Sequence, residues 1–102
     1  MIRPLSKEEM RKFVKDMYKE LHVVAAHQLD SMNIEELKHS AMTNNKEALV
    51  ELLIREERGE LSDDKHFYRI IEMLLFEAVD DIQHDPEQTL KRAFWQMTNL
   101  KN

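Results

Sequence analysis

The 102-residue chain contains no cysteine, only one glycine and only two prolines. The absence of cysteine excludes disulfide bonds, thiolate metal ligands and a cysteine nucleophile. Sheets of many strands need many turn residues, and phosphate-binding loops need several glycines, so the sequence argues against both. No apolar run reaches the roughly 18 residues of a membrane span. We therefore expect a helical, cytoplasmic protein that does not interact with membranes.

Hydrophobic residues make up 42% of the chain, which is enough for one core. A chain of this length has no room for a second independent core, so residues 1–102 are predicted to form a single helical domain. Breaks in the apolar pattern coincide with helix-capping signals. The signals are Ser6 with Glu9, Asn33 with Glu36, Asn44 with Glu47, Gly59 at a helix end, Ser62, and Asp85 before Pro86.

The apolar stripes repeat with a helical period between these signals. They predict helices over residues of about 7–29, 34–42, 45–58, 63–84 and 86–100. The two longest have about 22 residues each, or roughly 33 Å, and must span the domain. We expect an all-α, compact bundle of four to five helices in which these two are antiparallel and the shorter helices close the sides.

The helix predicted over 63–84 is apolar around more than half of its circumference, which places it at the centre of the bundle. Its spare face would carry Met73, Phe76 and Val79. An alternative use of that face is contact with a second copy of the chain, which predicts a possible homodimer.

Charge is distributed unevenly around a net charge of −5. Residues 51–87 include twelve acidic and four basic side chains, whereas residues 88–102 include three basic and no acidic ones. Residues 1–20 carry a small basic excess. We expect the basic ends to fold back and pair with the acidic middle, because charge runs in small proteins usually serve solubility.

The acidic region carries a pattern that could support metal chemistry. The sequence Glu57-x-x-Glu60, followed by Glu77-Ala-Val-Asp80, resembles the E-x-x-E and E-x-x-D pair of the all-α NTP pyrophosphohydrolases. The resemblance implies that facing helices hold Mg²⁺ for attack by water on a nucleoside triphosphate. The four carboxylates fit a solvated acidic edge of a core helix better, because such spacings arise readily in a chain with 34% charged residues. Our main interpretation therefore assigns no catalytic residue, metal or cofactor, and keeps this enzyme as the alternative.

Trp95 is the residue on which the functional prediction depends. Helical spacing places it about 140° from Leu90, away from the core face of its helix. Lys91, Arg92 and Asn99 lie on the same side. Aromatic residues framed by basic and polar groups are typical of interface hot spots. The sequence thus predicts a non-catalytic protein-binding module, acting as a regulator, inhibitor or assembly partner, although docking of Trp95 within the fold is an equal possibility.

A third hypothesis uses the same tryptophan for nucleic acid. Trp95, Lys91 and Arg92 would then act together with the lysines of the first helix, Lys12, Lys15 and Lys19. The excess of acidic residues in the whole chain argues against nucleic-acid binding, because phosphates are repelled by negative charge.

Overall fold

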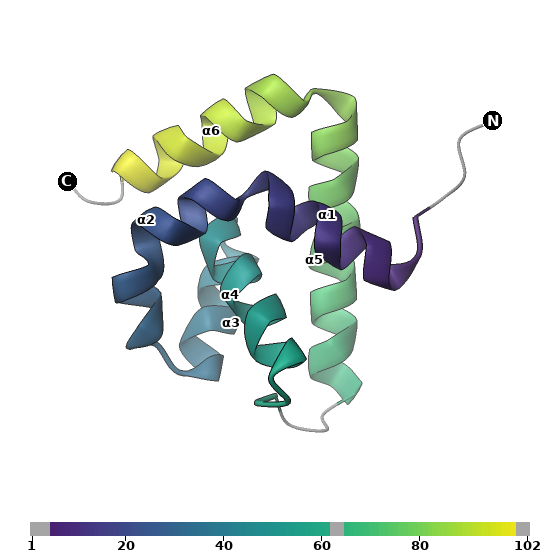
Figure 1. The fold of residues 1–102 in the computed structure, drawn as a ribbon, viewed down its shortest axis with the longest axis vertical. Helices are drawn as coiled ribbons and strands as arrows, with labels where there is room; N and C mark the ends of the chain where they lie inside the picture. The colour runs from purple at the N-terminus through teal and green to yellow at the C-terminus, as the bar shows by residue number, and fades with distance from the viewer. Residues whose placement is uncertain (1–4, 62–64, 100–102) are drawn as a thin grey trace.

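The computed structural model describes residues 5–61 and 65–99, with side chains as far as Gln96. These residues form six helices and no strand, which confirms the all-α prediction and adds a helix to the four or five expected (Figure 1). The helices are α1 (Lys7–Met17), α2 (Lys19–Asp30), α3 (Ile34–Met42), α4 (Lys46–Glu57), α5 (Lys65–His84) and α6 (Pro86–Asn99). The boundaries predicted for α3, α4 and α6 are confirmed to within one residue.

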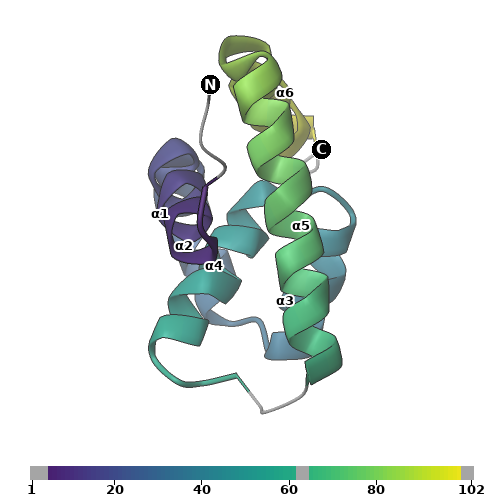
Figure 2. The same cartoon turned by 90° about the vertical axis from the view of Figure 1, so that its right-hand side faces the viewer.

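Helix α4 is the most buried helix, and only Glu57 at its end is exposed. Helix α1 packs on α5, α2 and α3 pack on α4, and α6 packs on the end of α5. Figure 2 shows α1 and α2 on one side of the molecule and α5 and α6 on the other. The six consecutive residues 48–53 of α4 are all buried. The central position therefore belongs to α4, and the prediction that the helix 63–84 occupies it is wrong.

The prediction of one long helix over 7–29 is also wrong, because the chain bends at Tyr18. This residue ends α1 and begins α2, with φ −104° and ψ 17°, and its side chain is fully buried. Neither proline nor glycine causes the bend. A straight helix of about 34 Å could not pack against both partners, since α1 packs on α5 and α2 packs on α4. Tertiary packing thus replaces the expected antiparallel pair with a bent helix that crosses α5 (Figure 1).

The predicted capping signals are largely confirmed. Ser6 with Glu9 and Asn33 with Glu36 form complete capping boxes. Asp85 accepts a hydrogen bond from the Gln88 backbone N–H at 3.2 Å. The predicted cap at Ser62 and the first residues of the helix 63–84 lie outside the described part of the chain. These local signals set most helix boundaries before any tertiary contact is considered.

Gly59 and Asn44 end the two helices that precede them. Gly59 has φ +71°, and the N–H of Glu60 donates to the carbonyl oxygen of Arg55 at 2.9 Å, as in a Schellman motif. Asn44 has φ +72°, and the N–H of Asn45 donates to the carbonyl oxygen of Ser40 at 3.2 Å in the same pattern. Asn44 is therefore the end of α3, and the N-cap of α4 is Asn45 rather than the predicted Asn44.

The buried core draws on all six helices, while α5 keeps a face in solvent. Phe76 is 67% exposed and Met73 is 49% exposed, as predicted for a spare face. Val79 is only 7% exposed and belongs to the core, so its assignment to that face is wrong. The reason is its helical position, four residues after Leu75 and three before Ile82, which are both buried.

Candidate functional site

Helix α6 is fixed to the rest of the fold along one side. Ala93 is buried, and the half-buried Leu90 and Phe94 pack against the core. The hydroxyl of Thr89 donates to the carbonyl oxygen of Asp81 in α5 at 2.9 Å. Near the far end of the helix, the Gln96 amide donates to the carbonyl oxygen of Thr43 at 3.4 Å. These contacts determine which face of α6 points outward.

The outward face of α6 carries the predicted binding residues. Trp95 is 70% exposed, the highest value among the exposed large hydrophobic residues of the described chain. Lys91 and Arg92 are also exposed, and they precede Trp95 by four and three residues, the spacing of neighbours on one helix face. Lys91 forms an exposed ion pair with Glu87 at 3.2 Å. The side chain of Asn99, the fourth predicted residue, lies outside the described part.

The four carboxylates of the pyrophosphohydrolase resemblance are not brought together. Glu57 forms an ion pair with Lys15 of α1, and Glu60 lies beyond Gly59, in the turn after α4. Glu77 and Asp80 are exposed on α5. Across residues 5–61 and 65–99, no group of three or more histidine or acidic side chains has the geometry to hold a metal ion.

Three of the four basic side chains of α1 pair with acidic residues of α4 and α5, as expected for the N-terminal end. Arg11 contacts the carboxylate of Glu56 through two nitrogens, at 2.6 and 3.1 Å. Lys7 and Glu72 form a further pair at 3.0 Å. Of the three lysines in the nucleic-acid hypothesis, Lys15 is neutralised by its ion pair with Glu57.

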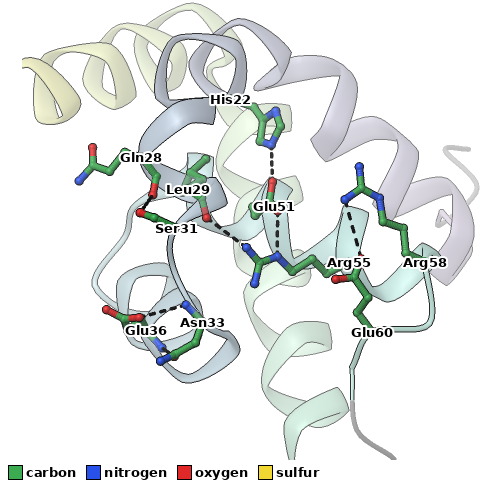
Figure 3. A network of polar contacts seen from close by, with 10 residues as sticks. All are labelled: His22, Gln28, Leu29, Ser31, Asn33, Glu36, Glu51, Arg55, Arg58 and Glu60. Atoms are coloured by element: carbon green, nitrogen blue, oxygen red, sulfur yellow. Dashed lines mark hydrogen bonds and ion pairs between the residues drawn. The ribbon is translucent and has the colours of Figure 1, made fainter.

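A buried polar network that was not predicted joins α2 to α4 (Figure 3). Glu51 is 4% exposed, and its carboxylate lies 2.7 Å from His22 Nε2 and 2.9 Å from Arg55 Nε. Arg55 also donates to the carbonyl oxygen of Leu29 at 3.1 Å. Burial alone would raise the pKa of Glu51, but the hydrogen bonds from His22 and Arg55 and the charge of Arg55 lower it.

The only sequence signal for this network was the four-residue spacing of Glu51 and Arg55 within an apolar helix. His22, in another helix, could not be connected to it. Because every member is held by another, the network fixes how α2 sits on α4 rather than presenting a free reactive group.

The fold and these residues define an all-α domain with an aromatic and basic outer face on α6. Comparison of the chain with protein-family models, curated proteins and solved structures finds no match. Among the described residues, no helix combines the length and apolar character needed to cross a bilayer.

Proposed function

We propose that the protein is a small protein-binding module that docks the outer face of α6 onto a partner protein in the cytoplasm, as a regulator, inhibitor or assembly partner. The observation that carries the proposal is the 70% exposure of Trp95. Tryptophan is a residue that folded proteins usually bury for the most part, and an exposed one is a strong anchor when a partner covers it.

The surroundings of Trp95 indicate the chemistry of the partner. Lys91 and Arg92 lie one turn before it, and residues 88–102 include no acidic side chain. A partner would therefore offer an apolar pocket for the indole ring beside an acidic rim. The pocket would supply most of the affinity, and the charges would orient the encounter and raise its rate. Loss of a hot-spot side chain of this kind typically costs at least about 2 kcal/mol of binding free energy.

The decisive experiment compares two exposed aromatic residues. Phe76 on α5 is 67% exposed, almost the same as Trp95, so it controls for non-specific binding through an exposed aromatic side chain. A photo-reactive amino acid would replace Trp95 in one variant and Phe76 in another, and both would be irradiated in a lysate of the source cells. We expect a cross-linked partner from position 95 and none of the same mass from position 76.

The Trp95→Ala and Phe76→Ala variants then test the affinity for the cross-linked partner in purified form. We expect Trp95→Ala to bind at least about 30-fold more weakly, which corresponds to 2 kcal/mol. Phe76→Ala should bind as the wild type does. Equal affinity of wild type and Trp95→Ala, with both proteins folded by circular dichroism, would contradict the proposal.

A second candidate function is self-association through α5. Met73 and Phe76 are three residues apart on one face, and both are exposed. Two copies could bury these side chains against each other. Sedimentation equilibrium at increasing concentration should then show a dimer that Phe76→Ser abolishes and Trp95→Ala leaves intact. A monomer at every concentration would remove this candidate without affecting the first.

A further inference from the structure

The exposed face of α5 carries two charged side chains in line with Met73 and Phe76. Helix α5 lies at the outer edge of the fold, in the foreground of Figure 2. Arg69 lies four residues before Met73, Asp80 lies four residues after Phe76, and all four side chains are exposed. Spacings of four, three and four residues keep side chains on one stripe of a helix, as in the seam of a coiled coil. These four residues therefore form one continuous surface, the α5 stripe.

The two charges of the α5 stripe are not used within the fold. In the part of the chain that the structure describes, neither Arg69 nor Asp80 forms an ion pair. By contrast, Lys7, Arg11 and Lys15 of α1 each contact a carboxylate of α4 or α5. Arg69 and Asp80 are therefore available to a molecule that covers the stripe.

The α5 stripe is symmetric in its spacing and opposite in charge at its two ends. The point midway between Met73 and Phe76 is equally far along the helix from Arg69 and from Asp80. A two-fold axis through this point would make Met73 face Phe76 of a second copy, and Arg69 face Asp80 of that copy. Two-fold symmetry repeats each contact, so both ends of the paired helices would combine a cation with a carboxylate.

The orientation of the second copy follows from these charges. Parallel copies would place Arg69 against Arg69 and Asp80 against Asp80, and like charges in contact are destabilising. Antiparallel copies bring opposite charges together at both ends. Beside the stripe, Glu77 would lie near Glu72 of the second copy, but Glu72 already pairs with Lys7 at 3.0 Å. The pattern of charge thus fits a second copy of this chain in the antiparallel orientation.

We propose that two copies of the chain associate through the α5 stripe as an antiparallel two-fold dimer. Met73 and Phe76 lie at its centre, and Arg69 pairs with Asp80 at both ends. This geometry specifies the self-association given above as the second candidate function, and it rests on that candidate. Methionine and phenylalanine are both enriched at interface cores, so the centre supplies the affinity. Exposed ion pairs contribute little affinity, and their role is to select the orientation.

The antiparallel dimer would place the two copies of α6 far apart. Helix α6 follows α5 after one residue, and α5 has 20 residues, or a length of about 30 Å. The two Trp95 side chains would therefore lie towards opposite ends of the paired α5 helices. One dimer would then offer two α6 faces, and binding of a partner with two sites would be strengthened by avidity.

Exchange of the two charges tests the pairing directly. Arg69→Asp and Asp80→Arg would each place like charges at both ends of the dimer, so each variant alone should self-associate at least about tenfold more weakly than the wild type. An equimolar mixture of the two variants should recover the wild-type affinity to within about threefold, because each end again combines a cation with a carboxylate. Sedimentation equilibrium, with a fluorescent label on one variant, measures these dissociation constants. A mixture that associates no better than either variant alone would overturn the proposal.

Two further variants control for net charge. Asp30→Arg on α2 and Lys91→Asp on α6 make the same changes of charge at exposed positions outside the α5 stripe. Each should dimerise as the wild type does. Equal weakening by these variants and by the stripe variants would mean that net charge governs association, contrary to the proposal.

A spin label measures the orientation independently of charge. The chain has no cysteine, so Gln83→Cys, on exposed Gln83 three residues after Asp80, accepts a single label. In the antiparallel dimer the two labels should lie about 26 Å apart along the helices. In a parallel dimer they would be separated by only about 10 Å, the distance between packed helices, and this result would refute the proposed geometry.

Phe76→Ser distinguishes failure of this geometry from failure of the candidate function. A dimer that Phe76→Ser abolishes, but that Arg69→Asp and Asp80→Arg leave at wild-type affinity, would retain self-association through α5 and overturn the antiparallel pairing. A wild-type protein that is monomeric at every concentration would overturn both. Neither result affects the docking of α6 onto a partner protein, because Trp95 is not part of the α5 stripe.

Discussion

His22 and Glu51 meet across the interface of α2 and α4, with Nε2 of the imidazole 2.7 Å from Oε1 of the carboxylate. The second carboxylate oxygen of Glu51 accepts a hydrogen bond from Arg55 one turn later in α4. Both oxygens of a nearly inaccessible side chain are thus satisfied. A charge so placed stabilises the fold only while its partners are present.

Replacing Glu51 with alanine should strongly destabilise the protein. The change leaves Arg55, whose side chain is 12% exposed, without its carboxylate partner in a poorly solvated position. Breaking a buried ion pair from one side typically costs about 3–5 kcal/mol. Urea denaturation followed by circular dichroism would measure the loss in the free energy of unfolding.

Glu35→Ala provides the control for this variant. Glu35 pairs with Lys38 on α3 at 3.0 Å, but its side chain is 75% exposed. Exposed pairs contribute at most about 1 kcal/mol. If the two alanine variants lost the same stability, the buried network would contribute no more than a surface pair, and the structural interpretation of Glu51 would be wrong.

The same carboxylate predicts how stability depends on pH. Although burial raises the pKa of Glu51, its hydrogen bonds with His22 and Arg55 bring it below the ordinary value. The unfolded chain therefore takes up a proton at higher pH than the folded one. The contribution of Glu51 is complete above the unfolded pKa of about 4.3 and is lost as pH falls through the lower folded pKa.

Glu51→Gln isolates this effect because glutamine does not titrate. The difference in unfolding free energy between wild type and Glu51→Gln should shrink as pH falls below about 4.3. A difference that stays constant throughout, or grows in acid, would mean that the pKa of Glu51 is not lowered in the folded protein.

Gly59 and Asn44 both adopt the left-handed backbone conformation, and we expect opposite effects when each is substituted. Gly59→Ala should destabilise the protein by about 1–2 kcal/mol, the cost of a left-handed alanine. A Cβ at this position would meet no atom within 4 Å, so the cost comes from the backbone alone. Asn44→Gly should be neutral or slightly stabilising, because glycine adopts this conformation more readily. Thermal denaturation compares both variants with wild type, and a destabilised Asn44→Gly would show that the amide side chain itself contributes.

Local signals explain how much of the fold could be predicted. The capping boxes at Ser6 and Asn33 and the single glycine act over four or five residues, so the printed sequence contains all the information they need. The bend at Tyr18 depends on which helices α1 and α2 pack against, and no residue there breaks a helix by itself. Val79 was misplaced for a related reason, since its position at the edge of an apolar stripe is decided by neighbouring helices.

The candidate sites divide in the same way. The outward direction of Trp95 follows from helical spacing relative to Leu90, and the structure confirms it. The network of His22 with Glu51 joins residues from two different helices. The two residues lie 29 positions apart in the sequence. Nothing in the local pattern could connect them.

The single tryptophan makes the outer face of α6 directly measurable in the free protein. Trp95 should emit as a water-exposed indole, and iodide should quench it more efficiently than caesium, because Lys91 and Arg92 attract anions. Lys91→Glu should reduce the advantage of iodide, whereas Lys19→Glu, an equal change of charge on α2, should not. Trp95→Ala should change the free energy of unfolding by less than about 0.5 kcal/mol, while Leu75→Ala in the core should cost about 2–5 kcal/mol. Blue-shifted, poorly quenched emission from the dilute monomer would show that Trp95 is docked within the fold and unavailable to a partner.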